Sequence, residues 1–266
     1  MNDTNLKLEL SYKILSLFAY RIFSEDLKKF DLTNHKGKLL ISTLNPHSFY
    51  VAEHDPLFKE ALLNSTILLP DGIGIVIANW LLNFSRIPKI AGIDVFEYLL
   101  TELDASSIPS HKRVYFLGST DSNLLVIKQK IVKDFPSLTV GIYSPLFKPE
   151  FSKTELDAMI NAVNDFAPHV LFVGMTAPRQ EKWAYQNFSS LNTSIVCSIG
   201  AVFDFYSGRI KRPSIIWQQL GLEWLGRFLR EPFRLWRRTL ISMPYFMGRV
   251  LLEFIKKSFT KEPQLK

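Results

Sequence analysis

The chain has 266 residues, a formal net charge of +7, 47% hydrophobic residues and a mean hydropathy of +0.07. These values predict either one large α/β domain or a domain of roughly 200 residues with an appendage, and they exclude general disorder. The single cysteine, Cys197, excludes a disulfide framework and a cysteine-based zinc site. No secretory signal and no uncharged apolar run of transmembrane length is evident, so we expect a cytoplasmic protein.

Positive charge is concentrated at the C-terminal end of the chain. Residues 209–266 contain 13 Lys and Arg but 4 Asp and Glu, a net charge of +9, whereas residues 1–208 carry a net charge of −2. Such an asymmetry predicts an anionic partner for the tail, either nucleic acid or a membrane surface.

The N-terminal part of the chain alternates between helical and strand-like patterns. Mixed apolar spacing over residues 7–30 predicts one or two helices within an N-terminal segment of residues 1–37. Residues 38–43 have the pattern of a strand, and one continuous helix is expected over residues 47–63. His47 and His54 are expected on a solvated face of that helix.

The next strand ends at a carboxylate. The run from Ile67 to Leu69 predicts a buried strand, Pro70 ends it, and a helix is expected from Ile73. Asp71 therefore lies at the carboxyl end of a strand just before a helix, where open α/β sheets bind their ligands. The alternative interpretation is that Asp71 serves as the N-cap of that helix.

Strand and helix patterns continue to alternate as far as residue 204. Strands are predicted at residues 114–117, 138–143, 170–173 and 194–199, and helices at 95–103, 124–135, 152–166 and 179–187. This alternation predicts an α/β fold with a parallel sheet and helices on both faces. We place the α/β domain at residues 1–207 and a basic helical appendage at residues 208–266.

Two turns after strands could bind a phosphate. The stretches that begin at Gly118 and Gly174 both lead from a strand to a helix N-terminus, where backbone N–H groups favour an anion. Neither is a Walker A loop, and Gly72-x-Gly74 lacks the third glycine of a dinucleotide fingerprint. Tight α/β turns explain each of these glycines as well.

The tail carries arginines at helical spacing with Leu, Phe and Trp between them. A new helix or a kink is expected at Pro232. A basic amphipathic helix on an anionic membrane is favoured over a nucleic-acid surface, because no nucleic-acid recognition motif accompanies the arginines. An ordinary exposed helix packed on the core is the other alternative. The arginines are Arg227, Arg230, Arg234, Arg237 and Arg238.

Several blocks, in order over about residues 40–240, together resemble one family. The most specific blocks are Ala177-Pro-Arg-Gln-Glu-Lys182 and Leu222-Glu-Trp-Leu225. Three further blocks are Leu69-Pro-Asp-Gly-Ile-Gly74, Ala91-Gly-Ile-Asp94 and Gly200-Ala-Val-Phe-Asp204. In these blocks the sequence resembles the WecG/TagA/CpsF glycosyltransferases (glycosyltransferase family 26).

The resemblance implies an inverting transferase with a Rossmann-like domain of the GT-E type. It would move a sugar from a UDP-sugar to a polyprenyl-diphosphate-linked saccharide at the inner face of the bacterial plasma membrane, and the appendage would reach that membrane. No cofactor and no metal are expected, because an Asp-x-Asp motif is absent and the tail arginines would supply the countercharge. Nucleic acid is not expected as a partner, and a homo-oligomer is possible.

The resemblance also assigns residues. Asp71 corresponds to the proposed general base, and Thr43 and Gln180 correspond to residues of the sugar or acceptor site. Arg227, Arg234 and Arg237 match appendage arginines thought to hold the diphosphate, and Lys89 stands where an arginine is often found. With Lys89, the further substrate-binding candidates are Asn45, Asp94, Gly118, Ser119, Gly174, Pro178, Arg179, Lys182, Phe203 and Asp204.

Two other classes of function stay open from the residues alone. A nucleotide-dependent oxidoreductase is possible on the same class of fold, although the glycine fingerprint is incomplete. A non-enzymatic membrane or nucleic-acid adaptor would explain the tail but not the polar residues at the strand ends.

Overall fold

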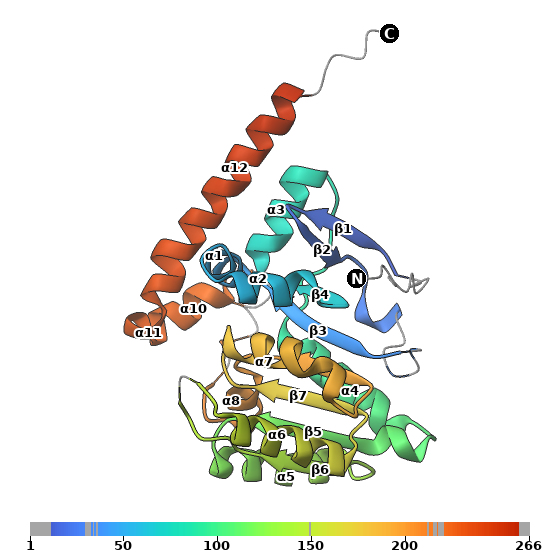
Figure 1. Cartoon of the computed structure of the whole chain (residues 1–266). Helices are drawn as coiled ribbons and strands as arrows, with labels where there is room; N and C mark the ends of the chain where they lie inside the picture. Colours follow the sequence, from blue (N-terminus) through green and yellow to red (C-terminus); the bar gives the residue numbers. More distant parts are fainter. Residues whose placement is uncertain are drawn as a thin grey trace.

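A six-stranded parallel sheet forms the centre of the molecule (Figure 1). The computed structural model describes residues 12–29, 33, 35, 37–148, 150–211, 213–214, 217 and 221–260. The strands lie in the order β4-β3-β8-β7-β5-β6, and the predicted parallel α/β architecture is confirmed. Their bounds are β3 (Leu39–Leu44), β4 (Ile67–Pro70), β5 (Arg113–Gly118), β6 (Thr139–Tyr143), β7 (Val170–Gly174) and β8 (Ile195–Ser198).

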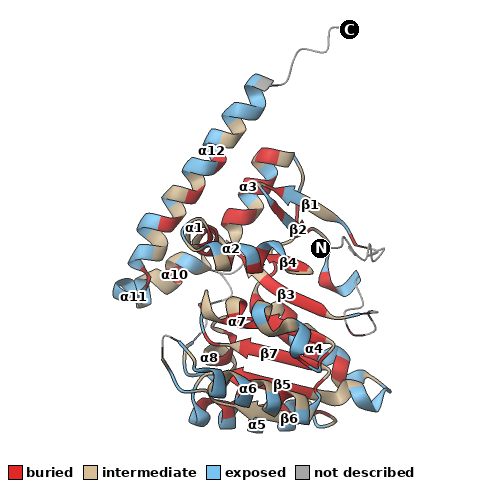
Figure 2. Cartoon of the chain, in the orientation of Figure 1, coloured by how far each residue is buried: buried red, intermediate tan, exposed pale blue. Residues whose placement is uncertain are grey.

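Helices cover both faces of the sheet because the strands are apolar on both sides. Figure 2 shows the central strands buried beneath these helices. On one face lie α4 (Gly92–Ala105), α5 (Asp121–Asp134) and α8 (Val202–Ser207). There Phe96 of α4 packs against Phe172 of β7, with ring centres 4.9 Å apart. On the other face lie α6 (Lys153–Phe166) and α7 (Arg179–Asn187), where Trp183 packs with Val173 and Val196.

The predicted helix over residues 47–63 is two helices, α1 (Pro46–Ala52) and α2 (Pro56–Leu63). Pro56 has no N–H to continue the first helix, and it takes the first position of the second. The Asp55 side chain caps α2 by accepting a hydrogen bond from the Phe58 N–H over 3.0 Å. The helix α3 (Ile73–Asn83) follows β4 as predicted.

The N-terminal helices predicted over residues 7–30 are wrong for the described part of that segment. β1 (Ile14–Leu17) and β2 (Tyr20–Phe23) form an antiparallel hairpin, followed by a 3-10 turn at Leu27–Lys29. In β2, exposed Arg21 lies between buried Tyr20 and Ile22, which is the period of a strand. Residues 7–11 and 30 lie outside the described residues.

The C-terminal segment contains α10 (Glu223–Arg230), α11 (Pro232–Trp236), a π-helical turn (Arg237–Ser242) and α12 (Met243–Thr260). As predicted, Pro232 begins a new helix. Along one side, α12 lies against α1 and α3 (Figure 1). Phe246 and Val250 of α12 are buried in a core cluster with Phe49 of α1, so the last helix shares the core of the α/β domain.

Candidate active site

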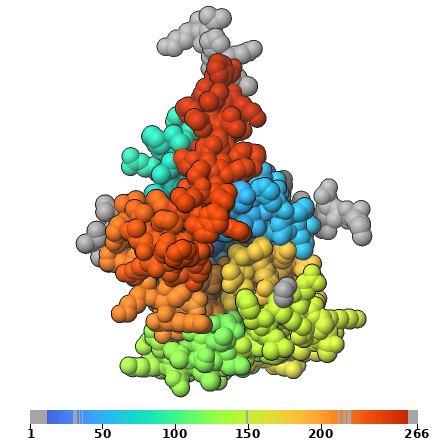
Figure 3. Space-filling view, turned by 90° about the vertical axis from the view of Figure 1, so that its left-hand side faces the viewer, coloured from blue at the N-terminus to red at the C-terminus, as the bar shows by residue number. Residues whose placement is uncertain are grey.

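A cavity of about 830 Å³ opens at the C-terminal edge of the sheet. Residues at the ends of β3, β4, β5, β7 and β8 form one wall, and the C-terminal segment supplies the opposite wall. Figure 3 views the molecule from this edge, where the orange and red C-terminal segment lies beside the blue α1 and α2 and the yellow α7. The site therefore combines residues of the α/β domain with residues of the basic C-terminal segment.

Asp71 occupies the end of β4 within this cavity. Its backbone N–H donates to the Leu44 carbonyl over 2.9 Å, which extends the pairing of β4 with β3 by one residue. Gly72, with φ of +87°, takes the N-cap position of α3 and makes no side-chain cap. Asp71 is therefore not the cap of α3, and its carboxylate instead accepts a hydrogen bond from Asn45 Nδ2 over 3.1 Å.

The groups around Asp71 shift the pKa of its carboxyl group in opposite directions. Burial has the largest effect and raises the pKa of the carboxyl group. The Arg238 guanidinium and the hydrogen bond from Asn45 act in the opposite direction, whereas the Glu223 carboxylate raises the pKa further. A carboxyl group with a raised pKa is a better proton acceptor than a free aspartate, which is what general base catalysis requires.

Four arginines of the C-terminal segment line the cavity opposite the sheet: Arg227, Arg234, Arg237 and Arg238. Burial lowers the pKa of Arg238, and the nearby Asp71 carboxylate opposes that shift. The Arg227 guanidinium lies 5.0 Å from the centre of the Phe205 ring. Guanidinium groups gathered in a partly desolvated cavity bind phosphate well, because each presents a planar fork of donors.

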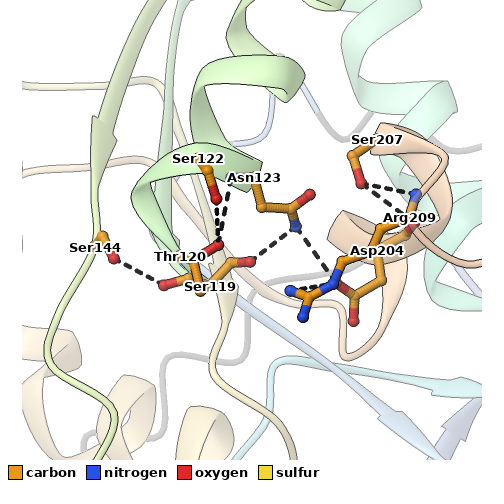
Figure 4. Close-up of polar contacts among 8 residues, drawn as sticks. All are labelled: Ser119, Thr120, Ser122, Asn123, Ser144, Asp204, Ser207 and Arg209. Atoms are coloured by element: carbon orange, nitrogen blue, oxygen red, sulfur yellow. Dashed lines mark hydrogen bonds and ion pairs between the residues drawn. The ribbon is translucent and has the colours of Figure 1, made fainter.

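A polar cluster lies at the β5 and α8 side of the cavity (Figure 4). Asn123 Nδ2 donates to Ser119 Oγ over 2.8 Å and to Asp204 Oδ1 over 3.4 Å. The Asp204 carboxylate also lies 4.0 Å from the Arg209 guanidinium. These side chains offer donors and acceptors for a polar ligand that extends away from the tail arginines.

Two buried polar side chains belong to the start of α7. Gln180 Nε2 donates to Glu181 Oε1 over 2.8 Å, and both residues line the cavity although the side chains are only 1% and 3% exposed. Burial raises the pKa of Glu181 to about 7. On the same helix, the Arg179 guanidinium lies 5.1 Å from the Phe147 ring centre.

Across the described part of the chain, His, Cys, Asp and Glu side chains form no group of three or more that could hold a metal ion. Cys197 is buried in β8, where burial raises the pKa of its thiol, so it is not a nucleophile.

The sequence of the region that builds this cavity matches one family. A model of the glycosyl transferase WecG/TagA/CpsF family matches residues 22–260. The chain belongs to this family. It is therefore a glycosyltransferase, with its basic tail included in the matched region.

Relatives within the family have been named for the reaction they catalyse. A protein of Bacillus subtilis strain 168 is 30% identical over 85% of this chain and 84% of its own length. A protein of Bacillus spizizenii strain W23 is 30% identical over 86% of this chain and 84% of its own length. A Staphylococcus aureus strain MW2 protein is 24% identical over 85% of each chain. All three are named N-acetylglucosaminyldiphosphoundecaprenol N-acetyl-beta-D-mannosaminyltransferase.

Most residues predicted as site residues of this glycosyltransferase lie together. Lys89, on the loop before α4, reaches across to Glu223 of α10, with Nζ and Oε2 3.8 Å apart. The predicted residues that line the cavity are Thr43, Asn45, Asp71, Lys89, Ser119, Gly174, Arg179, Gln180, Phe203, Asp204, Arg227, Arg234 and Arg237.

Four predicted substrate-binding residues do not line the cavity. Asp94 caps α4, because its Oδ2 accepts a hydrogen bond from the Ala91 N–H over 2.8 Å. Lys182 is paired with Asp55 at 2.9 Å, across to α2. Gly118 has φ of +118°, and a Cβ there would lie 2.4 Å from the Gly174 oxygen, so it permits the turn. Pro178 takes the N-cap position of α7.

The prediction that His47 lies on a solvated helix face is wrong. His47 lines the cavity, and its Nδ1 lies 2.9 Å from Ser242 Oγ because the C-terminal segment covers this side of α1. Burial and, to a lesser degree, Arg238 lower the pKa of His47 to about 4. His54 is exposed as predicted, but it lies in the turn between α1 and α2 and not on a helix.

The sequence analysis missed Glu181, Glu223 and Arg238, which line the cavity, and Asn123, which does not line it but donates to Ser119 and Asp204. Three of these residues belong to segments that the sequence analysis names: Glu181 and Glu223 lie in the blocks that resemble the family, and Arg238 is one of the tail arginines. Asn123 carried no such signal, because its approach to Asp204 depends on how α5 packs against α8.

Proposed function

We propose that this glycosyltransferase moves a sugar from a UDP-sugar to a polyprenyl-diphosphate-linked saccharide with inversion at the anomeric carbon. The observation that carries the proposal is Asp71, a carboxylate with a raised pKa in a cavity whose opposite wall bears four arginines. The relatives named above act on a diphosphoundecaprenol-linked acceptor, which supports the same class of acceptor here.

In the proposed reaction an acceptor hydroxyl oxygen attacks the anomeric carbon from the face opposite UDP. The new C–O bond forms while the bond from that carbon to the UDP oxygen breaks, and its electron pair leaves with UDP. Asp71 accepts the hydroxyl proton, so the charge is balanced by neutralisation of the carboxylate. A single displacement of this kind inverts the configuration of the transferred sugar.

Stabilisation of the leaving diphosphate is assigned to the tail. Arg227, Arg234, Arg237 and Arg238 would donate to the phosphate oxygens as negative charge develops there, a role that a divalent metal fills in other transferases. Thr43 and Gln180 would contact the transferred sugar or the acceptor. The nucleoside would extend toward the polar cluster at the ends of β5 and α8: Ser119, Asn123 and Asp204.

We further propose that the tail binds the cytoplasmic face of the plasma membrane peripherally. Of the helices described, none is long and apolar enough to cross a bilayer. Large apolar side chains of α10, α11, the π-helical turn and α12 are instead exposed among basic ones, as expected of a segment that lies in the interface. They are Leu229, Phe233, Trp236, Leu240, Ile241, Leu251, Leu252, Ile255 and Phe259.

Turnover of a panel of UDP-sugars on a short lipid-diphosphate-saccharide acceptor tests the reaction. We expect product with at least one of UDP-N-acetylmannosamine, its uronic acid or UDP-glucose, and an unchanged rate in EDTA. The anomeric proton coupling of the product reports inversion. A thermal shift with NAD but not with UDP would favour the oxidoreductase alternative instead.

A further inference from the structure

The start of α7 presents two orphaned polar atoms beside the cavity. The Gln180 amide nitrogen donates to Glu181 Oε1, but Gln180 Oε1 and Glu181 Oε2 have no hydrogen-bond partner among the described residues. An ionised carboxylate without a cation partner costs far more to bury than a protonated carboxyl group does. Both side chains line the same cavity as Asp71 and the arginines.

The cations nearest in sequence do not neutralise Glu181. Lys182 is paired with Asp55 of the segment before α2, and the Arg179 guanidinium is directed to the Phe147 and Phe151 rings. From the other packed elements, α2 contributes Glu60, which accepts a hydrogen bond from Tyr185, whereas Cys197 of β8 lies in the core cluster on the opposite face of the sheet. The strands β3 and β7 present no charged side chain beneath α7.

We propose that Glu181 is a neutral carboxylic acid that positions the Gln180 side chain in the cavity wall, and that ionisation of Glu181 weakens the productive binding of an anionic donor. This inference rests on the proposed function for its kinetic consequences. The protonated acid accepts the Gln180 amide N–H on one oxygen and thereby fixes the orientation of that amide. Loss of the proton places a negative charge beside a cavity that must receive a diphosphate.

Burial raises the pKa of Glu181 to about 7, which places its titration within the range of an enzyme assay. Hydrogen bonds from Gln180 and from its own backbone lower the pKa but do not outweigh burial. If Glu181 had only a structural role, activity would depend on the presence of its side chain but would not change when its carboxyl group loses a proton.

The test compares pH profiles of kcat/KM for the full chain and for Glu181→Gln, which cannot ionise but keeps the shape. We expect the wild type to lose activity roughly 20-fold between pH 6.5 and pH 8.5, because only a few per cent of the acid is protonated at the upper value. The kcat/KM of Glu181→Gln should change less than about 2-fold between pH 6.5 and pH 8.5, whatever its value at pH 6.5, because this variant has no proton to lose at that position. Glu181→Ala should lose about 10-fold at every pH.

Glu60→Gln is the matched control, because it removes a carboxylate that contacts α7 outside the cavity, and its profile should equal that of the wild type. The proposal is wrong if Glu181→Gln keeps the wild-type alkaline loss or if Glu181→Ala is fully active. A second readout does not need turnover: the carboxyl ¹³C resonance that disappears in Glu181→Gln should titrate near pH 7. A midpoint below about 5.5 would refute a neutral Glu181, whereas absence of turnover with every donor would refute only the proposed function.

Discussion

The Asn45 side-chain amide donates a hydrogen bond to Asp71 Oδ2 over 3.1 Å, and this contact joins the ends of the neighbouring strands β3 and β4. Asn45 Oδ1 accepts hydrogen bonds from the backbone N–H groups of His47 and Ser48, over 3.0 and 2.9 Å. Because the oxygen is committed to capping α1, the amide nitrogen must face Asp71. The start of a helix thus orients the candidate base.

Asp71→Asn should lower kcat by a factor of roughly 10² to 10⁴, because the amide cannot accept the acceptor proton. The fold should persist, since the variant removes a buried charge and keeps the shape of the side chain. Steady-state turnover and thermal unfolding measured on the same preparation check both statements. Activity within about 3-fold of the wild type would remove the base assignment.

Asn45→Asp separates the two roles of Asn45. The new carboxylate can still accept the N–H groups of His47 and Ser48, so the cap of α1 should survive. It cannot donate to Asp71, and two facing carboxylates should raise the pKa of Asp71 further and move the acidic limb of the pH–rate profile upward. Asn45→Ala should in addition destabilise the fold by about 1 kcal/mol in chemical unfolding. An unshifted acidic limb in Asn45→Asp would contradict this role.

Arg238→Ala should weaken UDP binding by roughly 10- to 100-fold, because a charge-assisted hydrogen bond to phosphate is lost from a desolvated position. Isothermal titration calorimetry measures the change. The exposed Arg230 serves as the control, since it lies outside the main cavity and donates to the Lys211 carbonyl. Equal losses in Arg238→Ala and Arg230→Ala would indicate a general charge effect in place of a defined contact.

Phe233→Ser should reduce binding to vesicles that contain anionic lipid by roughly 10- to 150-fold, because burial of one large apolar side chain contributes roughly 1.5–3 kcal/mol. Phe233 is 95% exposed on α11, so folding should not depend on it. Leu125→Ser on α5, a residue that is 51% exposed, removes an apolar side chain elsewhere on the surface. Cosedimentation should distinguish the two variants, and an equal loss in both would argue against the tail as the membrane surface.

The raised pKa of Glu181 predicts a pH-dependent stability with a defined sign. The folded state keeps the proton up to about pH 7, whereas the unfolded chain releases it near 4.5. The contribution of the protonated Glu181 side chain to the stability of the fold is therefore complete below pH 4.5 and is lost as the pH rises through 7. Relative to Glu181→Gln, the free energy of unfolding of the wild type should fall by up to about 3 kcal/mol across this window. Urea unfolding of both proteins at pH 4.5 and pH 8 measures the difference, and parallel curves would contradict the burial of a neutral acid.

Part of the site followed from local patterns. A short apolar run that ends at Pro70 predicts a strand with Asp71 at its end, and the alternation of strands and helices predicts the parallel sheet that gathers such ends at one edge. The hairpin at β1 and β2 was not predicted, because apolar residues over a short segment fit the period of a helix as well as that of a strand. Packing of β2 beside β4 decides between the two structures.

The sequence by itself determined the alternation of strands and helices over residues 38–204, the position of Asp71 at a strand end and the basic character of the tail, because each depends on neighbouring residues alone. Only the tertiary structure decided that Asn45 contacts Asp71, that Arg238 reaches the same cavity and that Glu181 is buried without a cation. The first requires β3 and β4 to be adjacent, the second requires the C-terminal segment to fold back over the sheet edge, and the third requires α7 to pack its polar start against the core. Adjacency and burial arise between residues far apart in the chain, and these set the chemistry of the site.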